Sequence, residues 1–228
     1  MPTPSSPSPL SKETLLTADA DWVRRWYGEL AQQFGDDHRS LGFNQRTSQQ
    51  KRFEALCELG DFNGRRLLDV GCGLGHFLLF LRQRGVHPEY TGLDITPELI
   101  GHARARFQGE SSLPCGFEVG DTLTYEPHKP FDFVVASGIF GLLSAQAEGR
   151  IAPTMHRLFS WATVGMAINF LSNRAPRQAK GRLYVDPSRM LSLALELTPA
   201  VRLHHNYLPN DFTLYLFKDP AWSKESQA

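Results

Sequence analysis

Cysteine is scarce in this chain of 228 residues. The three cysteines, Cys57, Cys72 and Cys115, are odd in number and form no Cys-x-x-Cys pair. Both features argue against a disulfide-stabilised scaffold and against a structural zinc site. We therefore expect reduced thiols, a cytoplasmic protein and no bound metal.

Net charge and long apolar runs are absent as well. Lysine plus arginine and aspartate plus glutamate both number 24, so the formal net charge is zero. A broad basic face for nucleic acid is therefore not expected, although a local patch stays open. The chain shows no basic segment followed by an apolar one and no apolar run as long as a membrane span. We thus expect neither secretion nor membrane insertion.

Apolar residues are also missing from residues 1–11, where proline and serine dominate. Such a composition cannot offset the entropy of ordering, so we expect a disordered tail over residues 1–17. After the tail we expect a helical cap at 18–60, a single core domain at 61–220 and a loose end at 221–228. A chain of this length can bury a sizeable single core.

What the sequence does contain is a strand, a glycine turn and a helix within residues 67–77. Residues 67–70 predict a buried parallel strand, and the apolar run after Gly75 predicts a helix packed on the sheet. Gly71, Gly73 and Gly75 stand at every second position of the turn. Glycine adopts backbone angles closed to other residues and lets a ligand lie against the main chain. The turn is therefore suited to hold either a dinucleotide or an adenosyl compound.

Asp69 separates these two ligands. Its carboxylate would repel a pyrophosphate but attract the amino group of S-adenosylmethionine. His76 also stands where a Gly-x-Gly-x-x-Gly dinucleotide loop has its third glycine. On these residues the chain, over roughly residues 62–218, resembles the class I S-adenosylmethionine-dependent methyltransferases.

The resemblance implies a doubly wound α/β fold. Its sheet is expected to be mostly parallel and seven-stranded with an antiparallel last strand, with helices on both faces and an N-terminal helical cap. The local patterns predict strands at residues 67–70, 89–95, 116–119, 130–140 (a range that includes the residues directly after the strand), 163–171, 201–208 and 212–218. They predict helices at 18–34, 45–59 and 146–161, among others.

Two acidic residues follow strands of this expected sheet. Asp94 closes the second strand, about 20 residues past the glycine turn, where a carboxylate can accept hydrogen bonds from both ribose hydroxyls. The alternative, that Asp94 caps the next helix, is disfavoured because Thr96 is available as that cap. The resemblance implies that Asp121 receives the adenine amino group. A turn aspartate that binds its own backbone is the alternative reading.

The N-terminal helices of such methyltransferases commonly cover the cofactor. By this resemblance Tyr27 and Arg46 are candidates to reach the methionine portion, with Arg46 pairing with its carboxylate. Alternatively, Tyr27 is part of an apolar helix face and Arg46 is an exposed charge. The complete set expected to bind S-adenosylmethionine is Tyr27, Arg46, Asp69, Gly71, Cys72, Gly73, Gly75, Phe77, Asp94, Ile95, Gly120, Asp121, Thr122, Ser137, Gly138 and Ile139.

The methyl acceptor is less well defined by the sequence. The (Asp/Asn)-Pro-Pro-(Tyr/Phe) motif, frequent in methyltransferases of nucleic-acid bases, is absent after the fourth strand, which favours a small-molecule acceptor. The loop at residues 172–182 carries four cations that either bind an anionic acceptor or are simply solvated. A hydroxyl acceptor would need a general base, for which the candidates are His38, His128, His205 and Asp211.

The sequence thus predicts an enzyme that transfers a methyl group from S-adenosylmethionine to a small molecule by in-line displacement. Three alternatives stay open at this point: an RNA or other nucleic-acid methyltransferase, an NAD-linked oxidoreductase, and a noncatalytic module that only binds an adenosyl compound.

Overall fold

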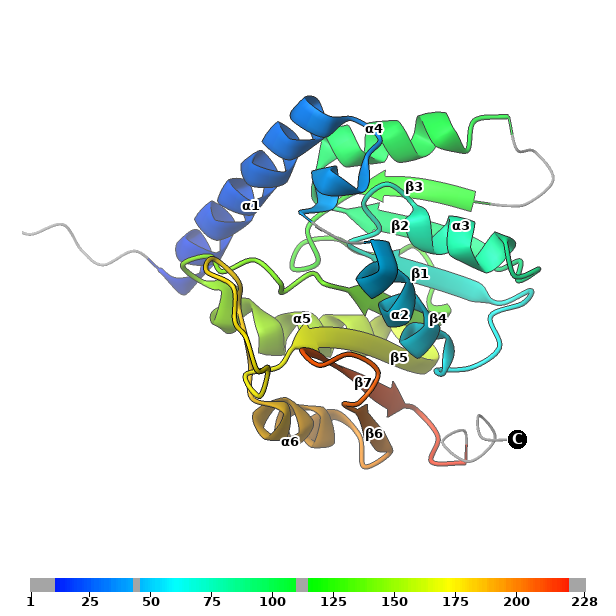
Figure 1. Ribbon diagram of the computed structural model, residues 1–228. Coiled ribbons are helices and arrows are strands. Elements are labelled where there is room, and N and C mark those ends of the chain that lie inside the picture. The colour runs from blue at the N-terminus through cyan, green and yellow to red at the C-terminus, as the bar shows by residue number, and fades with distance from the viewer. Residues whose placement is uncertain (1–10, 43–45, 110–114, 222–228) are drawn as a thin grey trace, which may run out of the picture.

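The computed structural model of the protein describes residues 11–42, 46–109 and 115–221. These residues form a seven-stranded sheet with helices on both faces (Figure 1). The strands are β1 (Arg66–Val70), β2 (Glu89–Asp94), β3 (Cys115–Val119), β4 (Phe131–Ser137), β5 (Ala162–Leu171), β6 (Val201–His204) and β7 (Asp211–Phe217). The helices are α1 (Lys12–Phe34), α2 (Arg46–Cys57), α3 (His76–Arg82), α4 (Pro97–Arg106), α5 (Ala147–Trp161) and α6 (Pro187–Leu197), with a short 3-10 helix η1 (His38–Leu41).

The strand order is β3-β2-β1-β4-β5-β7-β6. The first five strands of the chain pair in parallel, whereas β7 runs antiparallel to both β5 and β6. The chain order therefore reverses between β1 and β4, and in such sheets ligands bind beyond the carboxyl ends of the strands at this reversal. The expected fold, a mostly parallel sheet with an antiparallel last strand, is confirmed.

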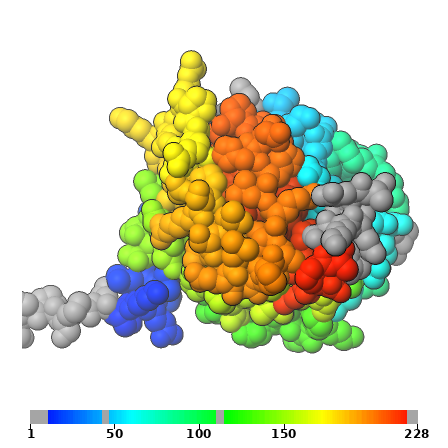
Figure 2. Space-filling model, turned by 90° about the horizontal axis from the view of Figure 1, so that it is seen from below, coloured from blue at the N-terminus to red at the C-terminus, as the bar shows by residue number. Residues whose placement is uncertain are grey.

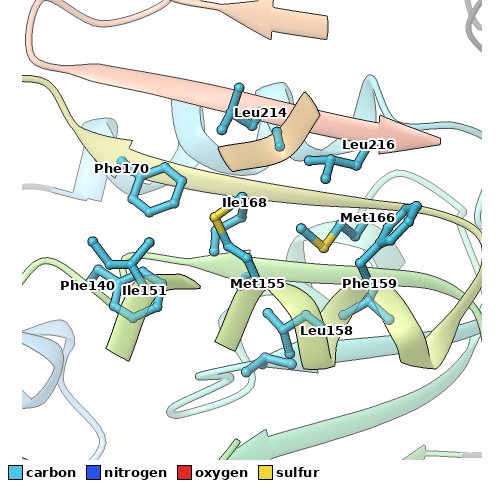
Figure 3. Close-up of a cluster of buried hydrophobic side chains, with 14 of the residues drawn as sticks. Phe140, Ile151, Met155, Leu158, Phe159, Met166, Ile168, Phe170, Leu214 and Leu216 are labelled. Carbon is cyan, nitrogen blue, oxygen red and sulfur yellow. The ribbon is translucent and has the colours of Figure 1, made fainter. Parts of the chain in front are cut away.

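Two buried clusters hold the helices on opposite faces of the sheet. Along β1, Leu68 and Val70 belong to the cluster under α5 and α6, whereas Leu67 belongs to the cluster under α2, α3 and α4. Figure 3 shows Met155 and Leu158 of α5 pointing toward Ile168 of β5. Because side chains alternate along a strand, Asp69 lies on the same side as Leu67, among apolar neighbours.

The outer end of the sheet carries α6 and β6, which cover the face seen in Figure 2, and the loop after β5 stands out at its edge. This loop, residues 172–186, joins β5 to α6. Pro187 begins α6, and the Asp186 carboxylate caps it by accepting from the backbone N–H groups of Ser188 and Arg189.

Helix α1 begins at Lys12, earlier than the expected residue 18, so residues 12–17 are helical rather than part of a tail. The Ser11 hydroxyl accepts a hydrogen bond from the Thr14 N–H at 3.2 Å and caps the helix. Arg150 of α5 also donates to the Leu16 carbonyl at 2.9 Å. This first turn is therefore held by a residue far away in the sequence. The expected disorder of residues 1–10 and the loose end at 222–228 lie outside the described residues.

None of the helices formed by the described residues is long and apolar enough to cross a lipid bilayer.

Candidate functional site

The glycine turn between β1 and α3 has the backbone geometry that its sequence predicts. Gly71, Gly73 and Gly75 have φ angles of 71°, 53° and 73°, in the region that disfavours side chains with a Cβ atom. At Gly75 an added Cβ would lie 2.7 Å from Cε2 of Phe107. The turn therefore needs glycine both for its backbone angles and for close packing.

We expect a Gly75→Ala variant to lose about 2 kcal/mol of stability, because it combines a left-handed alanine with a steric clash. The control is Gly101→Ala in α4, where an added Cβ has open space and alanine favours the helix. Urea unfolding should show a lower midpoint for the first variant and an equal or higher midpoint for the second. Equal midpoints for Gly75→Ala and the parent would contradict this prediction.

A first cavity lies beyond the carboxyl ends of β1, β2 and β4, at the reversal of strand order. Its volume of about 150 Å³ is below the ~300 Å³ typical of small-molecule sites. The side chains of Leu41 and Ile139 line this cavity and lie against Gly73 and Gly71 respectively, where they occupy space beside the turn. We expect both side chains to move when a ligand lies along the glycine turn.

Asp69 is buried in the wall of this cavity. The Tyr90 hydroxyl donates a hydrogen bond to its carboxylate at 2.5 Å. Burial raises the pKa of Asp69 to about 7, and the negative charge of Asp94 adds to this rise, while the Tyr90 hydrogen bond opposes it. A cation in the cavity would restore the ionised form, whereas a pyrophosphate would add a further negative charge beside it.

Asp94 connects the glycine turn to the start of α4. One carboxylate oxygen accepts from the Gly73 N–H and the other from the Thr96 N–H, both at 2.9 Å. Burial raises the pKa of Asp94, although these two hydrogen bonds lower it in part. Thr96 occupies the N-cap position but its side chain makes no capping hydrogen bond. Thr96 therefore takes the expected N-cap position without the expected side-chain bond, and the Asp94 carboxylate, which also lines the cavity, binds the N–H of Thr96 itself rather than one in the first turn of α4.

Asp121 lies in the cavity wall with its carboxylate already engaged. It accepts from the backbone N–H of Leu123 at 2.9 Å, as a turn aspartate does, and from Arg150 at 2.6 Å in a mostly buried ion pair. The structure therefore shows the alternative role of Asp121, a turn aspartate that binds its own backbone. Each carboxylate oxygen has more than one lone pair, so these contacts leave room for the expected adenine contact.

Helix α1 crosses the carboxyl edge of the sheet from α4 to α5 (Figure 1). Its residues Asp19, Val23 and Tyr27 line the cavity, so the helix covers it. The buried Asp19 carboxylate accepts from the Ser144 hydroxyl at 2.8 Å and from the Gln146 N–H at 2.9 Å. Arg24 donates to the Ile95 carbonyl at 3.1 Å. Together with the bond from Arg150 to the Leu16 carbonyl, these hydrogen bonds hold α1 over the site.

A second cavity, with a volume of about 330 Å³, adjoins the first and shares Tyr27, Leu41 and Gly138 with it. It lies between the ends of β4 and β5, α2 and the loop after β5. Burial raises the pKa of Tyr27, whose phenol contacts Arg182. The Asp211 carboxylate, also in this wall, binds Arg52 at 2.7 and 3.2 Å.

The structure gathers most of the expected cofactor residues around the first cavity. Those lining it are Tyr27, Asp69, Gly71, Cys72, Phe77, Asp94, Ile95, Gly120, Asp121, Thr122, Ser137, Gly138 and Ile139. Gly73 and Gly75 shape the turn without lining the cavity, and the side chain of Arg46 lies outside the described part of the chain. Their roles toward a ligand stay predictions.

The general-base candidates are not brought together. His38 pairs with Asp37, and His205 contacts the Ser172 hydroxyl at 2.7 Å. His38, His128 and His205 all lie outside the lining of both cavities.

Sequence reasoning missed several residues of the first cavity wall, among them Asp19, Gln49, Phe53, His76, Arg150 and Thr154. The one available signal was His76, which directly follows the glycine turn.

Across residues 11–42, 46–109 and 115–221, no group of three or more His, Cys, Asp or Glu side chains is arranged to hold a metal ion.

Comparisons with known proteins agree with this geometry. Residues 67–160 match the family model described as "Methyltransferase domain". A Mycobacterium tuberculosis protein named as a methyltransferase is 29% identical over 159 residues, which are 66% of this chain and 91% of that protein. The magnesium-protoporphyrin O-methyltransferase of Rhodobacter capsulatus is 34% identical over 91 residues, which are 40% of this chain and 39% of that relative.

Among solved structures, the magnesium protoporphyrin IX methyltransferase of Synechocystis, crystallised with bound SAH, matches with a TM-score of 0.65. The match covers 88% of this chain and 100% of that one at 15% identity. This likeness is one of fold.

Proposed function

The chain belongs to the class I S-adenosylmethionine-dependent methyltransferases, and from that premise we propose that it methylates a small-molecule acceptor by in-line displacement. The observation that carries the proposal is the buried Asp69 carboxyl, which faces the first cavity beside the glycine turn. This carboxylate pairs with the ammonium group of the cofactor. A cationic ligand is favoured there because Asp69 and Asp94 both lie in the same enclosed wall.

The remaining cofactor contacts follow from the positions of the strands. Asp94 accepts the ribose hydroxyls through lone pairs that Gly73 and Thr96 leave open. Asp121 and Thr122 meet the adenine, and helix α1 closes over the adenosyl group. The junction of the two cavities, near Gly138 and Tyr27, is where a cofactor held in this way would present its methyl group to an acceptor.

The chemistry needs little more than alignment. Displacement at a sulfonium methyl group disperses positive charge, so the enzyme gains most from holding nucleophile, methyl carbon and sulfur in line. A nucleophile seated in the second cavity approaches the methyl group past Gly138, where the absence of a side chain leaves space.

A small acceptor is supported by the size of the second cavity. Its volume of about 330 Å³ is at the low end of the ~300–1,000 Å³ range of small-molecule sites. The magnesium-protoporphyrin O-methyltransferase relative is named for a small-molecule acceptor as well.

The test is a methyl-transfer assay with S-adenosylmethionine labelled in its methyl group. A cell extract is divided by ultrafiltration into a small-molecule fraction and a macromolecular fraction, and each is incubated with the protein. Label that appears in the small-molecule fraction only supports the proposal. Label in RNA or protein would overturn the proposal of a small-molecule acceptor. The choice of cofactor is tested by calorimetry: binding of NADH without binding of S-adenosylhomocysteine would overturn it.

The raised pKa of Asp69 predicts a pH dependence of cofactor binding. Below pH 7 the carboxyl is protonated in the free protein and must lose its proton to pair with the ammonium. The affinity for S-adenosylhomocysteine should therefore fall up to about tenfold per pH unit from pH 7 to 5. Calorimetric titration checks this, with an Asp69→Asn variant expected to bind more weakly and without this dependence.

The raised pKa of Asp69 also affects the stability of the ligand-free protein. Rising pH lowers this stability, whereas it strengthens the binding of S-adenosylhomocysteine. Its folded state holds the Asp69 proton more tightly than the unfolded chain, whose pKa is near 3.8. The contribution of Asp69 to the free energy of unfolding therefore falls as pH rises from about 4 to about 7. Asp69→Asn should remove this decline, and a parallel pH profile of the two proteins would contradict it.

A further inference from the structure

The four cations of the loop after β5 have different surroundings. Arg174 pairs with Asp186 at 3.2 Å on the surface, and Arg177 and Lys180 are exposed. Arg182 is only half exposed and lines the second cavity. Of these four side chains, Arg182 is therefore the one that can meet a ligand there.

The backbone fixes Arg182 in this position. The Leu143 N–H donates to the Gly181 carbonyl at 3.0 Å, and the Leu183 N–H donates to the Gly141 carbonyl at 3.3 Å. These bonds join both neighbours of Arg182 to the segment after β4. Its guanidinium donates to the Gly42 carbonyl at 2.5 Å, which ties the loop to the end of η1.

Within the part of the chain that the structure describes, the Arg182 guanidinium contacts two neutral groups, the Gly42 carbonyl and the Tyr27 phenol. The carboxylate in the same wall, Asp211, is held by Arg52 in a two-pronged ion pair. The positive charge of Arg52 is thereby balanced, whereas no carboxylate of residues 11–42, 46–109 or 115–221 forms an ion pair with Arg182. The wall of the second cavity carries an excess positive charge that an anion can neutralise.

The rest of the wall is suited to a compact molecule with an apolar body. Phe170 and Leu171 of β5 contribute apolar surface beside Tyr184. Asn169 of β5 directs its carbonyl oxygen to the Gly138 N–H at 2.9 Å, which leaves its amide N–H₂ as the group facing Ser137. Asn169 and Arg182 both line the second cavity, so a polar amide and a cation share its wall.

We propose that the second cavity binds a small acceptor that carries an oxyanion, a carboxylate or a phosphate, paired with Arg182 and attached to an apolar body. This inference rests on the proposed function, because it identifies the class of acceptor for the same reaction. Arg182 holds the anion and thereby directs the rest of the acceptor toward the methyl group near Gly138.

The test uses three probes that share a phenyl ring: benzoate, phenyl phosphate and benzamide, which is the neutral isostere of benzoate. Their binding to the full chain, with and without saturating S-adenosylhomocysteine, is followed by saturation-transfer NMR titration. We expect one or both anions to bind at least about tenfold more tightly than benzamide, as a charge-assisted hydrogen bond implies. The stronger of the two anions distinguishes a carboxylate site from a phosphate site.

Variants assign this preference to a residue. Arg182→Gln should abolish the preference for anions, while Arg182→Lys, which keeps the charge, should retain part of it. The matched control is Arg174→Gln in the same loop, which should bind all three probes like the parent. Equal binding of benzamide and the anions by the parent would overturn the proposal, and so would an unchanged preference in Arg182→Gln.

Calorimetry with S-adenosylhomocysteine separates this inference from the proposed function. A parent protein that binds S-adenosylhomocysteine but does not prefer anions overturns the anionic acceptor alone. A parent that prefers anions through Arg182 but binds no S-adenosylhomocysteine overturns the proposed function and supports the anion site.

Discussion

An Asp94→Ala variant is expected to bind S-adenosylhomocysteine about a hundredfold more weakly than the parent protein. Two hydrogen bonds from ribose hydroxyls to a carboxylate would be lost, which corresponds to roughly 3 kcal/mol of binding free energy. The Gly73 and Thr96 N–H groups lose their partner as well, so the glycine turn and the start of α4 loosen. We expect a loss of about 2 kcal/mol in the free energy of unfolding.

Calorimetric titration and urea unfolding measure these two effects separately. Asp61→Ala is the control, because Asp61 is an exposed carboxylate that accepts from the Asn63 N–H at 2.9 Å and lines neither cavity. It should leave the affinity for S-adenosylhomocysteine unchanged. An Asp94→Ala protein that binds as tightly as the parent would remove the ribose role from Asp94.

The largest loss of stability is expected at the buried ion pair between α2 and β7. Arg52 and Asp211 meet at 2.7 Å with side chains only 8% and 2% exposed. Asp211→Ala leaves a buried guanidinium without its carboxylate, which costs about 3–5 kcal/mol. For a chain of this size that corresponds to a fall in Tm of roughly 10 °C, measurable by calorimetry.

A compensating pair of substitutions distinguishes lost charge pairing from lost packing. The double variant Arg52→Met with Asp211→Leu removes both charges and should recover most of the stability, since buried ion pairs are often replaceable by apolar residues. Glu148→Ala, which breaks the exposed pair between Glu148 and Arg189, is the control and should change stability by less than about 1 kcal/mol. An Asp211→Ala protein as stable as the parent would show that the ion pair does not contribute to stability.

Asp211 also illustrates how the structure revises a candidate for catalysis. In the sequence it is a titratable residue near a turn, and so a candidate base. In the structure both of its oxygens bind Arg52, a residue 159 positions away. No local pattern reveals such a partner, because the pair forms only when α2 packs against the sheet.

The start of α1 was missed for a similar reason. Residues 12–17 have too few apolar side chains to predict a helix on their own. The Ser11 side chain caps the helix there, which is a local feature, whereas the bond from Arg150 of α5 to the Leu16 carbonyl comes from a distant segment that local residue patterns do not reveal. The core strands were predictable because each of them is a short apolar run with turn residues at its ends.

The sequence by itself determined the glycine turn and the acidic residues Asp69, Asp94 and Asp121 near the ends of the strands. That was sufficient to locate the first cavity, because the carboxyl ends of parallel strands meet at one edge of the sheet. Only the tertiary structure decided that Asp94 fastens the turn to α4, and that Arg182 alone among the four loop cations reaches a cavity. These choices depend on contacts between distant segments, which packing sets and local residue patterns do not.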